Sequence, residues 1–112
     1  MGQLGKYLRR VTSGYAHWCP ACHVMHVFAV DRPLSNGAQW GFNGNIESPT
    51  FYPSMDISAK DPEDGWVFRC HYTITAGKIT FHGNSTHQMK DAVVDLPELP
   101  DRYRDKPGET HV

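Results

Sequence analysis

The clearest pattern in the sequence is an alternation of apolar and polar residues between positions 66 and 76, interrupted only by the apolar Val67 on the polar side. Cys70 lies on the apolar side of this alternation, between Phe68 and Tyr72. His71 falls on the polar side. Since successive side chains of a β-strand point to opposite faces of the sheet, the pattern predicts a strand with one buried face. We therefore expect Cys70 and His71 to point in opposite directions.

The alternation resumes after a turn, which predicts a β-hairpin. Gly77 is a typical turn residue, and alternating apolar positions return over residues 78–82. With Ala76 and Gly77 as the loop, Ile74 lies opposite Ile79 on the buried face.

Shorter patterns predict the remaining elements. Apolar or proline-bounded stretches favour strands over 23–30, 39–42, 54–58 (as an edge strand) and 93–96. Residues 1–13 are expected to form a short arm or first strand, and residues 98–112 are expected to form a loose tail. Thr86 is expected to cap a single helical turn that runs through Lys90. The predicted fold is mainly β, with a small α+β fold as the alternative. It is one zinc-stapled domain over 1–112, a compact antiparallel sheet with hairpins and at most one short helix.

Length, composition and charge narrow the class of protein. A chain of 112 residues fits one domain, and its 39% hydrophobic content suffices for a core. The formal net charge of −1 gives no general attraction to nucleic acid or to an anionic membrane. No apolar run approaches the ~20 residues of a membrane span, and the start of the chain lacks the apolar stretch of a secretory signal. We therefore expect a cytoplasmic protein without a membrane partner.

Three cysteines beside seven histidines indicate metal binding in a reducing compartment rather than a disulfide framework. The segment Cys19-Pro-Ala-Cys22 presents two thiolates on one tight turn, and a structural zinc ion needs two further Cys or His ligands. Cys70 is expected to be buried, and a buried thiolate needs compensation that a metal supplies. The first choice for a Zn²⁺ site is Cys19, Cys22, Cys70 and His87, with His26 or His71 as substitutes for one of the last two.

Other interpretations of these residues stay open. Cys70 can be an inert buried thiol, since free cysteine is among the most buried residue types. His26 can be a core histidine that bonds a backbone carbonyl. A redox pair at Cys19 and Cys22 is less favoured, because such a motif normally opens a helix and a strand is predicted after Cys22.

Five motifs stand between about residues 15 and 96: WCPAC over 18–22 with His26, WGFNG over 40–44, PTFYPS over 49–54, Cys70-His71 before Gly77, and Thr86-His87. Together they resemble a family of small uncharacterised proteins from tailed phages and prophages, often labelled automatically "ammonia monooxygenase". The resemblance implies a phage or prophage origin, the host cytoplasm, a zinc site and no known activity. The oxygenase label is not supported, since the chain lacks the membrane spans and copper-site context that such an enzyme needs.

Two positions depart from that family. His23 stands where the family commonly has Gly, and Ser85 stands where it commonly has Cys before the Thr-His pair. The Ser85 substitution indicates that this position is not essential to the metal.

Three classes of function follow, and the sequence favours a non-enzymatic one. The first is a protein-interaction or host-inhibitory module that docks on a host or phage protein through exposed Trp40, Phe42, Asn43, Phe51 and Tyr52. The alternative is that these aromatic residues belong to the core, and this applies above all to Trp40 and Phe42. The second is a zinc-dependent hydrolase with His26, His71 and His87 as ligands and Glu47 nearby. The third and weakest is nucleic-acid binding through Arg9, Arg10 and Arg69. The target and the oligomeric state cannot be read from the sequence.

Overall fold

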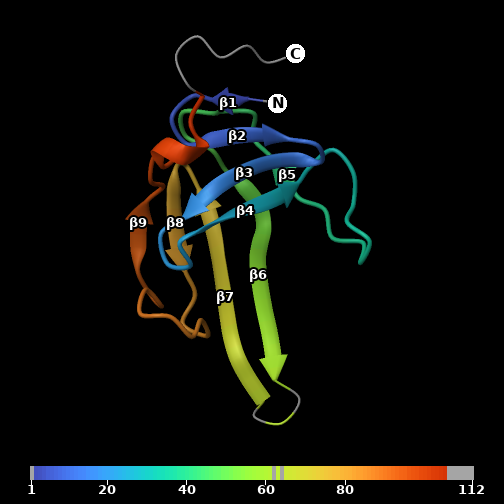
Figure 1. Cartoon of the computed structure of the whole chain (residues 1–112), viewed down its shortest axis with the longest axis vertical. Coiled ribbons are helices and arrows are strands. Elements are labelled where there is room, and N and C mark those ends of the chain that lie inside the picture. The colour runs from blue at the N-terminus through green and yellow to red at the C-terminus, as the bar shows by residue number, and fades with distance from the viewer. Residues whose placement is uncertain (1, 62, 64, 106–112) are drawn as a thin grey trace.

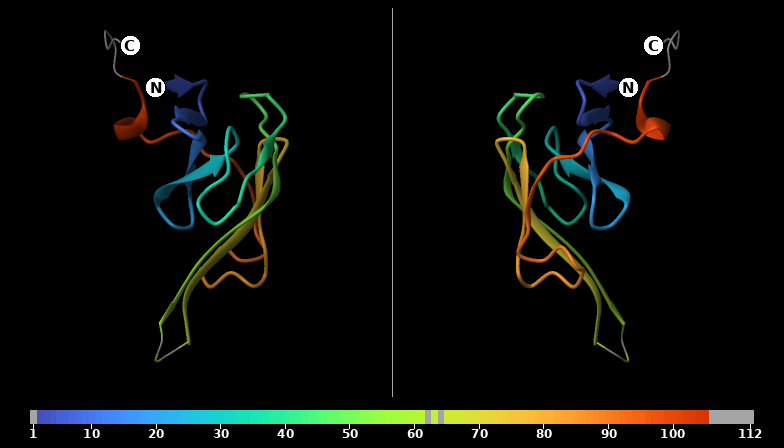
Figure 2. Two further views of the ribbon diagram at one scale, coloured as in Figure 1. Left: turned by 90° about the vertical axis from the view of Figure 1, so that its right-hand side faces the viewer. Right: turned by 90° about the vertical axis from the view of Figure 1, so that its left-hand side faces the viewer.

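The computed structural model describes residues 2–61, 63 and 65–105, which form two antiparallel sheets packed against each other (Figures 1 and 2). The first sheet has the order β1-β2-β3-β4, with bounds Gln3–Leu4, Leu8–Val11, Gly14–Cys19 and Val24–Ala29. The second has the order β5-β6-β7-β8-β9, with bounds Gly41–Phe42, Phe51–Asp61, Gly65–Thr75, Lys78–Phe81 and Val93–Asp95. The prediction of a mainly β fold is confirmed, but the single predicted sheet is in fact two.

The hairpin of β7 and β8 has the register expected from the sequence. Ile74 lies opposite Ile79, and Tyr72 lies opposite Phe81. All four side chains are almost completely buried, because this register directs every apolar position of both strands to the inner face. Ala76 and Gly77 form the turn, both with positive φ, as a two-residue hairpin loop requires.

The two longest strands, β6 and β7, form a hairpin that projects beyond the other strands (Figure 1). β5 pairs only with Phe51 and Tyr52, so from Pro53 onward the outer edge of β6 has no neighbouring strand among the described residues. The predicted edge strand over 54–58 is therefore confirmed as part of a longer strand.

Aromatic side chains from both sheets form the core. Phe28 of the first sheet stacks on Phe51 of the second at a centroid distance of 4.3 Å, with an interplanar angle of 4°. Tyr72 packs edge-on against Phe28, and Leu8 and Phe81 complete the centre. Burial of each such side chain contributes about 1.5–3 kcal/mol, so this cluster holds the two sheets together.

The two ends of the chain compare differently with the predictions. Of the two forms predicted for the start, an arm or a first strand, residues 3–11 take the strand form, as β1 and β2 of the first sheet. The predicted loose tail is packed down as far as residue 105. Leu99 is fully buried, its amide donates to Lys6, and Asp105 pairs with Arg9. Residues 106–112 lie outside the described residues.

The predicted helical turn after Thr86 is a series of non-helical turns and bends. A short 3-10 helix, η1, forms at Asp101–Tyr103 instead. No helix within the described ranges is long and apolar enough to cross a membrane.

Candidate metal centre and serine site

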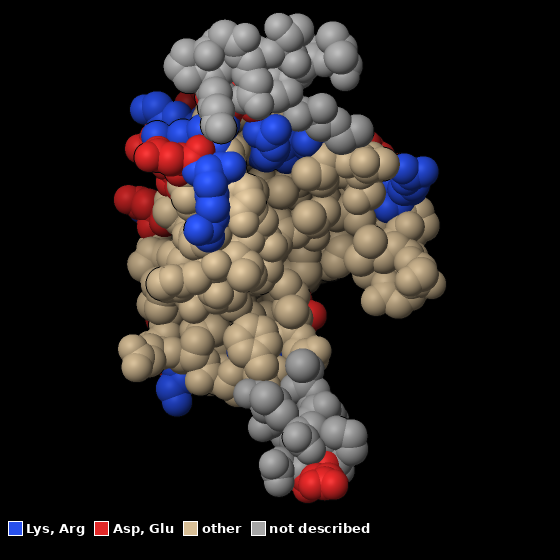
Figure 3. Space-filling view, viewed as in Figure 1, with Lys and Arg blue, Asp and Glu red and all other residues tan. Residues whose placement is uncertain are grey.

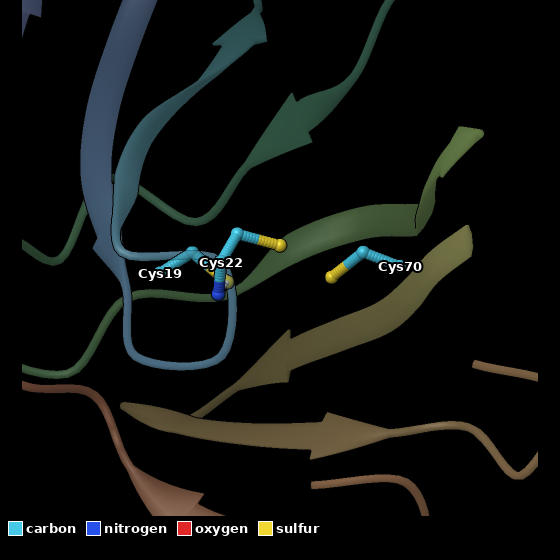
Figure 4. Close-up of side chains that lie close together, drawn as sticks. All are labelled: Cys19, Cys22 and Cys70. Carbon is cyan, nitrogen blue, oxygen red and sulfur yellow. Dashed lines mark hydrogen bonds between the residues drawn. The ribbon is translucent and has the colours of Figure 1, made fainter. Parts of the chain in front are cut away.

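Three cysteine sulfurs meet between the two sheets. Cys19 ends β3, Cys22 lies in the turn before β4, and Cys70 lies on the inner face of β7 (Figure 4). Their Sγ atoms all lie within 4.8 Å of one another, and Cys19 and Cys70 are fully buried. In a tetrahedral zinc site the sulfurs lie about 2.3 Å from the metal and therefore roughly 3.8 Å from one another. The three sulfurs need to move only slightly closer together to bind one ion. These three cysteines can hold a metal ion.

The three thiols differ in how readily they ionise. A hydrogen bond from Cys70, helped by His26 and the backbone amide of Cys22, lowers the pKa of Cys19 to about 3 despite its burial. Burial and the neighbouring Cys19 raise the pKa of Cys22 to about 11. Cys19 and burial also raise the pKa of Cys70 far above its ordinary value. One thiolate is stable here without a cation, whereas three thiolates need a divalent ion to compensate their charge.

A buried hydrogen-bond network surrounds the cluster. The hydroxyl of Tyr72 lies 2.6 Å from Nε2 of His17 and 3.0 Å from Nδ1 of His26. Burial lowers the pKa of His17 to about 4, so this ring is neutral at physiological pH. His26 is engaged with Tyr72 on one side and Cys19 on the other, which makes it a neighbour of the cluster rather than a free ligand.

His87 has the one buried side-chain polar atom without a hydrogen-bond partner among the described residues. Its Nδ1 accepts from the Met89 amide at 3.2 Å, whereas its Nε2 is buried and unpaired. His87 lies with Pro20 and Ala21, at the tip of the cysteine turn, around a pocket of about 450 Å³. Neither His87 nor His26 belongs to the group of ligand atoms within 4.8 Å of one another.

His71 points to the opposite face of β7 and forms a second site. Its Nε2 lies 3.0 Å from the hydroxyl oxygen of Ser54, and its Nδ1 lies 3.1 Å from Oδ1 of Asn84. Because Asn84 Oδ1 can only accept, the proton of the neutral ring is on Nδ1. Nε2 is then free to accept from Ser54, which is the arrangement of a nucleophile, a general base and a group that orients the base.

A β-bulge directs Ser54 toward His71. Phe51 pairs with Ile74 and Met55 pairs with Tyr72, so three residues of β6 stand opposite the single Thr73 of β7. Bulges of this kind redirect side chains and are common beside active sites.

The backbone of His71 is held by Ser85. The His71 amide donates to Ser85 Oγ at 3.0 Å, and Ser85 Oγ donates to the His71 carbonyl at 3.1 Å. Ser85, one of the two positions at which the chain departs from the phage-family pattern, therefore holds the backbone of His71 through both of its hydrogen bonds.

Further titratable groups lie around the His71 ring on the same face. The ring of His82 stacks on that of His71 at 4.2 Å, and burial together with His71 lowers the pKa of His82. A hydrogen bond from Arg69 lowers the pKa of Asp56, with smaller contributions from both histidines. A carboxylate thus stands within electrostatic range of His71 at neutral pH.

The structure does not bring together the residues of two predicted ligand sets. His71 lies on the other face of the strand from Cys70, so its ring points away from the cysteine cluster. The three-histidine site also fails: His26 is buried between the sheets, and His71 contacts Ser54 outside them.

The predicted aromatic contact patch is not exposed as a whole. Phe51 is 1% exposed, and Trp40 and Phe42 pack against the core. Asn43 is exposed, but its side-chain oxygen accepts from the amides of Asn45 and Thr50 and so shapes its own loop. Tyr52, at 55% exposure, is the one aromatic of that set that faces solvent.

The arginines proposed for nucleic-acid binding are neutralised. Arg9, Arg10 and Arg69 pair with Asp105, Asp31 and Asp56, respectively. The face in Figure 3 has basic and acidic side chains intermixed rather than a basic patch.

The fold and the two sites define a small two-sheet β-protein with a cysteine cluster inside and a serine–histidine pair outside. Residues 4–82 match the family described as "Bacterial ubiquitination-like system serine protease (BubE)". The chain belongs to the BubE family. No curated protein and no solved structure matches it.

Sequence reasoning placed the cysteines but overlooked Ser54 and Asn84. No local motif marks Ser54, since its partners stand 17 and 30 positions further along the chain and only the β6–β7 pairing and the 83–86 turn bring them together. The one available signal was His71 on the polar face of its strand, with a serine on the predicted neighbouring edge strand.

Proposed function

We propose that this protein is a serine peptidase of a bacterial ubiquitination-like system, with Ser54 as nucleophile and His71 as general base. The observation that carries the proposal is the contact of 3.0 Å between Ser54 Oγ and His71 Nε2, with Asn84 on the far side of the ring. The description of the family as a serine protease supports the same reaction class.

The reaction follows from these three side chains. Ser54 Oγ attacks the carbonyl carbon of the scissile amide while its proton passes to His71 Nε2. The C–N bond then breaks, the leaving amine takes that proton, and an acyl ester remains on Ser54. Water attacks the ester, gives a proton to His71, and the ester bond breaks as Ser54 regains its hydrogen. Asn84 keeps Nδ1 protonated throughout, and Asp56 stabilises the transient imidazolium through space.

The cysteine cluster supports a structural role for a zinc ion in this enzyme. Cys19, Cys22 and Cys70 supply three ligands from both sheets, and we assign the fourth to His87. Its unpaired Nε2 beside the cysteine turn favours it over His26, whose ring is already engaged. Thiolate ligands on a divalent ion at this position tie β3 to β7.

Earlier hypotheses receive less support. A docking module would need the exposed aromatic patch, of which Phe51 and most of Trp40 and Phe42 are covered. A zinc hydrolase would need a metal beside the reacting groups, whereas Ser54 of β6 and His71 of β7 meet on the outer face of their sheet, away from the buried cysteines.

The test is labelling with a fluorophosphonate, which reacts with activated serines. Mass spectrometry is expected to find the adduct on Ser54 in the wild-type chain. Ser54→Ala removes the adduct, and His71→Ala slows labelling roughly 100-fold or more because the base is lost. Ser35→Ala, at an exposed loop serine, serves as the matched control and labels at the wild-type rate. Absence of a Ser54 adduct, with the fold intact by circular dichroism, would contradict the proposal.

A further inference from the structure

We propose that the substrate of Ser54 is an extended peptide that binds as an added β-strand along the open edge of β6. This inference rests on the proposed peptidase function and specifies its substrate class. The edge begins just beyond Ser54, since β5 ends its pairing at Tyr52 and no other strand of the described residues adjoins β6 on that side.

The backbone groups of Asp56 point away from β7. Asp56 pairs with His71, whose amide donates to Ser85 and whose carbonyl accepts from the His82 amide. Both backbone groups of His71 therefore point toward β8, and the pair with Asp56 is a non-hydrogen-bonded one. It follows that the N–H and C=O of Asp56 face the open edge.

The backbone of Ser58 points the same way. Its partner Arg69 donates its amide to Thr86 Oγ1, and its carbonyl accepts from the Thr86 amide. Asp56 and Ser58 thus offer two donors and two acceptors in the spacing that a β-ladder uses. Outside the strand pairs, no hydrogen bond within the described part of the chain involves these four groups.

Trp40 determines where the added strand leaves the edge. Its indole N–H donates to the carbonyl of Ser54 at 3.2 Å, so that position cannot pair with a ligand. The ring also packs edge-on against Phe28 on the inner side of the sheet. A peptide that follows the edge past Asp56 must therefore pass over the outer face, where the hydroxyl of Ser54 lies beside His71.

The chemistry of this edge selects a polypeptide backbone in the extended form. Alternating donors and acceptors along a strand are matched by another strand, the mode used in β-augmentation. A folded helix cannot supply them, because its own backbone groups are paired internally. The scissile bond is thus expected in an unstructured segment, such as a linker or a chain terminus.

The experiment uses the full chain and a defined mixture of unstructured synthetic 14-residue peptides, with cleavage sites identified by mass spectrometry. In the best-cleaved peptide, each backbone amide is then N-methylated in turn. Methylation of alternate amides on one side of the scissile bond is expected to slow cleavage about tenfold or more, because each removes a donor to the edge. Methylation of the amides between them has little effect, which provides the control within the same peptide.

A protein variant gives a second measurement. Ser58→Pro removes the outward N–H without touching the ladder to β7, a position at which edge strands tolerate proline. The ratio of peptide cleavage to fluorophosphonate labelling of Ser54 is expected to fall about tenfold or more. Labelling of Ser54 requires an intact serine site, so a variant that is still labelled is folded.

The outcomes separate the two proposals. If Ser54 is not labelled in the wild-type chain, the peptidase function fails. If Ser54 is labelled but N-methylation has no alternating effect, the strand-addition inference alone fails. If sedimentation finds dimers that Ser58→Pro dissociates, a second copy of the chain occupies the edge and the inference is likewise overturned.

Discussion

Cys70 and His71 are neighbours on β7 whose side chains serve two different sites on opposite faces of one sheet. Cys70 meets Cys19 and Cys22 between the sheets, and His71 contacts Ser54 on the outside. A constraint on the Cys70 side chain therefore also limits how far the His71 backbone can move.

Removal of the metal is expected to lower both stability and activity. Because a metal ion bound by Cys70, as proposed, restrains β7, a strong chelator should lower the melting temperature and slow fluorophosphonate labelling of Ser54. Added Zn²⁺ should restore both. The control is Cys70→Ser, which should have low labelling that neither chelator nor Zn²⁺ changes. Wild-type labelling that persists after elemental analysis finds no metal would contradict this coupling.

Substitution of His87 is expected to weaken metal binding far more than substitution of His26. If His87 is the fourth ligand, as proposed, its loss should reduce the affinity at least roughly 100-fold, and His87→Cys should restore it. Competition with a chromophoric chelator measures the affinity, and Co²⁺ absorption reports tetrahedral geometry. If His87→Ala and wild type bind the metal with equal affinity, His87 is not the fourth ligand and another group must occupy that position.

Asn84 is predicted to act as a positioning residue for His71. Asn84→Ala removes the acceptor for Nδ1–H, so kcat should fall roughly 10- to 1,000-fold while KM stays near its wild-type value. Asn84→Asp keeps the acceptor and should recover most of kcat, which a purely structural role would not explain. Steady-state kinetics on a cleaved peptide measures both constants.

Tyr72 is predicted to stabilise the fold through its hydroxyl. Tyr72→Phe leaves Nε2 of His17 and Nδ1 of His26 buried without that partner, at a cost of about 1–3 kcal/mol in the free energy of unfolding. Tyr52→Phe, at an exposed position, is the matched control and should change stability by less than about 0.5 kcal/mol. Urea unfolding of wild type and the two variants measures these changes in the free energy of unfolding. Equal changes for Tyr72→Phe and Tyr52→Phe would contradict the prediction.

The pair of Asp56 and Arg69 predicts a pH dependence of stability. The hydrogen bond from Arg69 lowers the pKa of Asp56 below 3.8, its value without such a partner. A carboxyl whose pKa is depressed by folding contributes stability above its unfolded pKa and loses that contribution as the pH falls through the folded one. Wild type should thus be more stable than Asp56→Asn at pH 7, and the difference should shrink below pH 3.8. A difference that grows on acidification would reverse the sign of this argument.

The strand pattern was predictable where one face of a strand is buried. The alternation over 66–76 placed Cys70 inside and His71 outside, and the turn at Gly77 set the register of β7 and β8. Burial imposes a period of two on the sequence, so such strands can be recognised locally. The division into two sheets was not recognisable, because it depends on which strands pair at long range.

Of the candidate site, only the part formed by residues close together in the sequence was predictable. Cys19 and Cys22 are only three positions apart in the sequence, and a tight turn is enough to bring their thiols together. Phe51 was mistaken for a surface residue because its proline-bounded segment resembles a loop, whereas β6 carries it into the core.

The β-rich class, the alternation of the central hairpin and the paired cysteines were all predictable, because each depends on residues close together in the chain. The meeting of Ser54, His71 and Asn84 was not, since a bulge in β6 and the turn after β8 must both form first. Catalytic geometry is a relation between distant segments, and the free energy that maintains it comes from the packing of the whole core.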